Sequence, residues 1–185
     1  MTYLDNIDTE KVDKILKETN KNVEYFTSIT DSTVKEYTKD LDALMQKILT
    51  EVIKEQSPEV EVIESCFVEL THLVYYMGER LESLGIYDDM SEAAQKEVYN
   101  KAYLNNQSDI SVTGKKPTVA ENQAVAEGES IYESCVNSIY ARAYRIVKFK
   151  IEAAETMIST LSKMLSRRIN IDNNVANKRI LNEVL

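Results

Sequence analysis

The sequence predicts an all-α protein, with a helical hairpin followed by one very long C-terminal helix, bundle-like and assembled as a homo-oligomer. The first observation is that 185 residues contain only four Gly and two Pro, which leaves few helix breakers. A sandwich or barrel would need many more turns. The second is a run of apolar residues from Ile131 to Leu165 that recurs every three to five positions, as one helix face does.

The N-terminal part is expected to form two helices. A short amphipathic segment over residues 8–18 is interrupted by the polar stretch 19–22. The side-chain oxygens of Asp31, Ser32 and Thr33 can then accept hydrogen bonds from the first amides of a second helix, which runs to about Gln56.

A third helix is expected to start at Ser57-Pro58-Glu59. Serine caps the helix, proline suits its first position, and glutamate favours the positive end of the helix dipole. Gly85 is expected to end this helix in a left-handed cap. Because the corner before it is tight, the second and third helices are predicted to form an antiparallel hairpin.

The remaining segments follow from their caps. Asp88, Asp89 and Ser91 predict a fourth helix up to Asn105, so that residues 1–107 form an acidic helical region and residues 108–117 a loop. A capping box at Thr118 and Glu121 then starts the long helix, which is expected over 118–170, with a short C-terminal tail over 171–185.

The predicted long helix would measure about 75 Å. It is therefore expected to be covered by helices of other subunits. Its heptad pattern is imperfect, because Lys150 and Arg168 fall on the same side as the apolar stripe. Their charged ends either reach solvent or pair with acids across an interface, which favours a bundle over a continuous two-stranded coiled coil.

Charge is distributed unevenly along the chain. The net charge is −9, but residues 141–185 hold nine Lys/Arg against four Asp/Glu and so carry +5, which leaves −14 on the remainder. An acidic body with a basic end can pair head to tail with copies of itself, or it can present the basic end to a polyanion.

No catalytic, cofactor or metal site is legible, so a non-enzymatic protein is predicted. His72 is the only histidine and is expected to be a packing residue on or beside a core face. Cys66 and Cys135 are expected to be buried free thiols in a reducing compartment. With no membrane-spanning run and no secretory signal, a cytoplasmic location in the host cell is expected, or a place in a virion.

A candidate nucleic-acid-binding surface lies on the long helix, away from its apolar stripe. Cations neutralise phosphates, and an aromatic ring offers a stacking surface that accepts any base. In the alternative interpretation, Phe149 packs on another helix and the cations pair with Glu152, with Glu155 or with acids of a neighbouring subunit. The predicted binding residues are Arg142, Arg145, Lys148, Phe149, Lys163, Arg167, Arg168, Lys178 and Arg179.

The C-terminal third resembles a known family. The stretches Ile151–Glu155, Met157–Leu161 and Ser166–Ile171 are similar to the closing helix of phage recombination mediator proteins of the UvsY type. The resemblance implies a helical, ring-like homo-oligomer that binds single-stranded DNA and helps to load a recombinase. Arg167, Arg168, Lys178 and Arg179 would then match the basic end of that family.

We therefore expect a non-enzymatic phage-type accessory protein that binds single-stranded DNA and recombination proteins. The first alternative is a structural or assembly protein, a virion component or scaffold, whose long helix serves self-association. The second alternative is an acidic inhibitor that mimics nucleic acid through the −14 portion of the chain.

Overall fold

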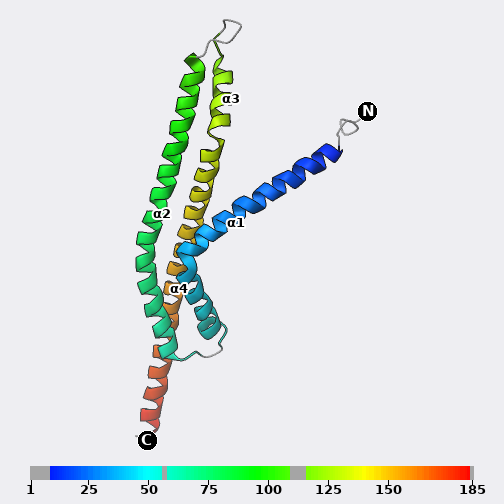
Figure 1. Cartoon of the computed structure of the whole chain (residues 1–185). Coiled ribbons are helices and arrows are strands. Elements are labelled where there is room, and N and C mark those ends of the chain that lie inside the picture. Colours follow the sequence, from blue (N-terminus) through cyan, green and yellow to red (C-terminus); the bar gives the residue numbers. More distant parts are fainter. Residues whose placement is uncertain (1–8, 56–57, 109–115, 184–185) are drawn as a thin grey trace. The chain divides into compact units, whose positions relative to one another are not determined.

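The computed structural model describes residues 9–55, 58–108 and 116–183, except for the side chains of residues 9, 12 and 172–183. Its elements are α1 (Thr9–Ile48), a π-helical turn η2 (Leu49–Ile53), α2 (Val60–Ser108), α3 (Val119–Glu129) and α4 (Ile131–Glu183). No strand occurs among these residues, which confirms the all-α class (Figure 1). The chain divides into a first unit, Met1–Lys35 with Tyr87–Ala143, and a second unit, Glu36–Ile86 with Tyr144–Leu185.

The second unit is a bundle of three helical segments with an aliphatic core. The end of α1, the start of α2 and the middle of α4 lie side by side in it (Figure 1). Steps of three, four and seven residues place one face of each segment inward. The fully buried apolar side chains are Leu41, Ile48 and Val52, then Ile63, Cys66, Leu70, Met77 and Leu84, and finally Val147, Ala154 and Leu161.

The predicted antiparallel hairpin is confirmed in this unit. Lys47 of α1 pairs with Glu69 of α2 at 3.1 Å, while Asp40, earlier in α1, pairs with Arg80, later in α2, at 3.2 Å. The reversed order of the partners means that the two helices run in opposite directions. The corner lies after η2, where Lys54 N–H bonds to the Leu49 carbonyl at 3.0 Å.

The first unit packs through small and polar side chains. Ala102, Ala126 and Ala143 are buried, and so are the polar residues Asn122 and Ser130. Short side chains let α2 approach α3 and the start of α4 closely. Asn106 Nδ2 donates to Asn122 Oδ1 at 2.7 Å, and Asn137 Nδ2 donates to Gln95 Oε1 at 2.9 Å. These bonds, with the stacked rings of Tyr87 and Tyr140, align α2 antiparallel to α3 and α4 within the unit.

The expected interruptions in the N-terminal part are absent, because α1 is one continuous helix. It runs through the polar stretch 19–22 and through Asp31-Ser32-Thr33, which was expected to be a cap. Thr33 Oγ1 instead donates to the Ile29 carbonyl one turn earlier, at 3.0 Å. A threonine or serine bonded in this way is accommodated inside a helix at small cost.

Gly85 does not end a helix, because α2 continues to Ser108 and absorbs the predicted fourth helix. A Cβ atom at Gly85 would lie 3.3 Å from Tyr144 Cε2, so the glycine gives room for close packing of α2 on α4. Ser91, expected to belong to a cap, donates its hydroxyl to the Asp88 carbonyl at 2.8 Å inside the helix.

The long helix expected over 118–170 is two helices, and the second one continues past Asn170. The capping box at Thr118 and Glu121 is confirmed as the start of α3. Ser130 then interrupts the helix with φ −93° and ψ 12°, and its hydroxyl donates to the Ala126 carbonyl at 2.8 Å. The expected tail over 171–185 is helical as far as Glu183.

The buried face of α4 differs from the predicted stripe. Val147 is fully buried, whereas Ile146 and Ile131 of the predicted stripe are exposed. Ile151, Ala154 and Leu161 are buried within a single chain, in the second unit. The cover expected from other subunits is therefore supplied at these positions by the chain itself.

Candidate nucleic-acid interface

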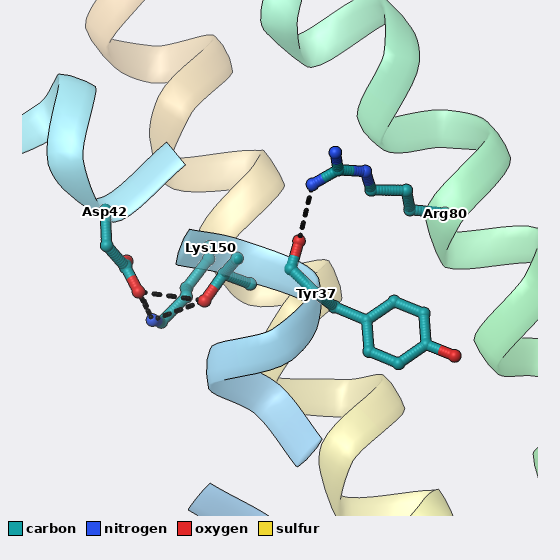
Figure 2. Close-up of polar contacts among 5 residues, drawn as sticks. Tyr37, Asp42, Arg80 and Lys150 are labelled. Carbon is teal, nitrogen blue, oxygen red and sulfur yellow. Dashed lines mark hydrogen bonds and ion pairs between the residues drawn. The ribbon is translucent and has the colours of Figure 1, made fainter. Parts of the chain in front are cut away.

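Lys150 fixes how α4 is rotated in the second unit. Its Nζ donates to Asp42 Oδ2 at 2.6 Å, to Asp42 Oδ1 at 2.7 Å and to Thr38 Oγ1 at 3.0 Å. The Thr38 hydroxyl in turn donates to Asp42 Oδ2 at 2.8 Å, so that all three groups are joined (Figure 2). Of the two alternatives for Lys150, pairing with an acid is confirmed, although the acid belongs to the same chain.

Arg80 holds α2 against α1 in the same unit. One of its guanidinium nitrogens donates to the Tyr37 carbonyl at 3.3 Å, and the other donates to Asp40 Oδ2 at 3.2 Å. Figure 2 shows Arg80 and Lys150 reaching α1 from two different helices. The two cations therefore hold α1 against both α2 and α4. The outward face of α4 thus belongs to a bundle whose three helical segments are joined by polar contacts.

The outward face of α4 in the second unit carries Arg145, Lys148 and Phe149, all exposed. Phe149 keeps 68% of its surface accessible, so the described chain does not bury it against another helix, which was the alternative interpretation. Since successive helical residues are 100° apart, the inward direction of Lys150 turns Lys148 and Phe149 toward solvent. Glu152 is the one carboxylate on α4 within a turn of this group.

The other predicted cations of the second unit lie further along α4. Lys163 and Arg167 are exposed, whereas Arg168 is half-buried. Lys148 and Lys163 form no ion pair with any residue that the structure describes. From Arg145 to Arg167 the helix rises about 33 Å, so these cations form an extended row. The side chains of Lys178 and Arg179 lie outside the described residues.

Arg142 belongs to the first unit and has a different environment. It is exposed and lies at a groove of about 260 Å³ that is lined chiefly by apolar side chains. The groove residues are Val23, Phe26 and Thr30 of α1 and Ile131, Ser134, Cys135, Ser138, Ile139 and Arg142 of α4. No feature of the sequence alone indicates this groove, because it needs α1 and α4 to lie together.

The remaining residues that could take part in catalysis or metal binding do not come together in one site within the part of the chain that the structure describes. His72 is exposed rather than packed in a core, and its ring meets Tyr76 edge-on at 4.8 Å. Cys66 is a buried free thiol as expected, and burial raises its pKa, while Cys135 is free and half-buried. No group of metal-ligating side chains comes together among residues 9–55, 58–108 and 116–171.

Neither a search for membrane-spanning helices in the described chain nor a comparison with known proteins narrows the possible functions. None of the helices, as far as they are described, is long and apolar enough to cross a bilayer. No protein family model, no curated protein and no solved structure matches the chain.

Proposed function

We propose that this protein is a non-enzymatic accessory protein that binds single-stranded DNA along the outward face of α4. The observation that carries the proposal is the exposed ring of Phe149 on the same side of α4 as the exposed Arg145 and Lys148. A base can stack on the ring while the two cations neutralise neighbouring phosphates. A role as a recombination mediator, implied by the resemblance of the C-terminal third to the UvsY type, belongs to the same proposal.

A salt titration tests the proposal. Binding of a fluorescent oligothymidylate is measured by anisotropy between about 50 and 200 mM salt, where phosphate contacts cause a steep loss of affinity. Replacing Arg145 and Lys148 by Gln should lower the slope of log K against log salt by about 1.4, since each phosphate contact on a single strand contributes about 0.7. The matched control is Lys39→Gln/Lys54→Gln, two exposed lysines of the second unit outside α4.

The aromatic contact is tested separately. Phe149→Ala should weaken binding by about 1–3 kcal/mol, the usual contribution of one stacked base, without changing the salt slope. Tyr75→Ala removes an even more exposed ring from α2 and should leave binding unchanged. Absence of binding at the lowest salt, or equal losses in the site and control variants, would remove the proposal.

A second candidate function is assembly by self-association. The observation that favours it is the amount of exposed apolar surface in the described chain, which includes Ile15, Leu16, Tyr132 and Ile169. Large exposed apolar patches mark interaction surfaces in soluble proteins. Sedimentation equilibrium tests this function directly, because a scaffold must associate at the concentrations at which it acts.

A further inference from the structure

The N-terminal arm, residues 10–25 of α1, is a helix with no cover. Every described side chain in it is exposed, whereas the same helix is partly buried from Phe26 onward. In proteins most of the stability of a helix comes from packing of its apolar face. The apolar face of the arm is not packed on any part of the chain that the structure describes.

The bare face of the arm is apolar and continues a packed face. Ile15, Leu16 and Val23 are 54%, 53% and 57% exposed. At 100° per residue they share a side of α1 with Phe26 and Thr30, of which Thr30 is buried. One stripe thus runs along α1 and is covered only at its C-terminal end.

The stripe leads into the groove of the first unit. Val23, Phe26 and Thr30 form the α1 wall of this groove, and Ile131, Cys135 and Ile139 form the α4 wall. Next to the α4 wall, Tyr132 and Val136 are exposed as well. An apolar helix laid on the arm would therefore find a continuous surface that reaches from Ile15 to α4.

Charge favours a second copy of the chain as the occupant. The arm holds Lys11, Lys14, Lys17 and Lys21 against Glu10, Asp13, Glu18 and Glu24, so its net charge is zero. Two chains of net charge −9 repel one another, and this repulsion is weakest where they meet through a neutral segment. A neutral arm offers no net attraction to a polyanion, which argues against nucleic acid as its partner.

We propose that the arm of one copy packs on the arm and groove of a second copy, so that Ile15, Leu16 and Val23 of both become buried. Such a contact uses the same surface on each copy and closes on itself as a dimer. The inference rests on the second candidate function, self-association, and it names the surface that carries it. It is independent of DNA binding.

The test is sedimentation equilibrium of the full chain without nucleic acid. Ile15→Gln/Leu16→Gln removes apolar surface without changing charge, and glutamine is a good helix former. Its self-association should be at least about tenfold weaker than that of the wild type. Val68→Gln/Tyr75→Gln, a pair on α2 that is more exposed than the arm pair, is the control and should associate like the wild type. Circular dichroism at 222 nm should fall on dilution of the wild type, as released arms lose helix.

Each outcome of the sedimentation experiment either supports or removes the proposed arm contact. A wild-type chain that is monomeric at about 100 µM removes both the arm contact and the assembly function. A wild-type oligomer that the arm substitutions leave intact removes the arm contact alone. Weakening by the control pair as strongly as by the arm pair also removes it, because α2 would then carry the association.

Discussion

Lys150 of α4 and Asp42 of α1 are joined by two hydrogen bonds of 2.6 and 2.7 Å, across 108 positions of sequence. A third bond links the same amine to Thr38, whose side chain is buried. The three acceptors satisfy the three donors of the ammonium group. This contact sets which residues of α4 face the core and which face solvent.

Loss of the Lys150 amine should therefore destabilise the second unit. Lys150→Met keeps the stem and removes the hydrogen bonds, and we expect the free energy of unfolding to fall by about 1 kcal/mol in a urea titration. Lys96→Met, which removes an exposed pair with Glu92 within α2, should cost less, about 0.3–0.5 kcal/mol. Equal effects of the two substitutions would mean that the contact with Asp42 does not fix α4.

The two glycines inside α2 should respond differently to substitution. A Cβ at Gly78 meets nothing within 4 Å, so Gly78→Ala should raise the free energy of unfolding by about 0.5–1 kcal/mol. Gly85→Ala places its Cβ 3.3 Å from the Tyr144 ring and should stabilise less. Gly85→Leu should destabilise by about 1–3 kcal/mol through overpacking. Thermal unfolding of the three variants measures this order, and a reversed order of the alanine variants would contradict the close packing.

The capping box of α3 should make stability depend on acidity. The backbone amide and hydroxyl of Thr118 hydrogen-bond the Glu121 carboxylate and lower its pKa below its usual value of 4.5. A lowered pKa means that the carboxylate stabilises the fold above pH 4.5 and that this contribution is lost as the pH falls through the folded-state pKa.

Glu121→Ala should accordingly destabilise the protein at pH 7, and the difference from the wild type should shrink below pH 4. Urea unfolding at both pH values measures it. Glu127→Ala, in the last turn of the same helix, is the control without this cap. A difference between Glu121→Ala and wild type that persists unchanged in acid would exclude the carboxylate as its source.

The two thiols should react at different rates. Burial raises the pKa of Cys66, so little of its reactive thiolate is present at neutral pH, whereas Cys135 is half-buried at the groove. A chromogenic disulfide reagent should label Cys135 first and Cys66 only slowly. Cys135→Ser should retain only the slow phase, and unfolding in urea should make both thiols react alike. A fast phase in that variant would show that Cys66 is accessible.

Local signals in the sequence predicted the structure correctly where they agree with the packing. The scarcity of Gly and Pro, the restart at Pro58 and the capping box at Thr118 predicted the helical class, the hairpin and the start of α3. The helical period also predicted that the ring of Phe149 is exposed, because it places this residue away from the core. Arg142, which was assigned to the same surface, is exposed and also lines the groove of the first unit.

The sequence by itself determined that the chain is helical, where its hairpin turns and which side of α4 carries cations, because these follow from residue propensities and period. Only the tertiary structure decided that α1 passes through residues 19–22 and α2 through Gly85, that Val147 replaces Ile146 in the core, and that Ser130 divides the long helix. For Gly85 the reason is energetic: a glycine inside a helix costs about 1 kcal/mol, and burial of the aliphatic side chains that precede it in α2, Met77 and Leu84, exceeds that cost.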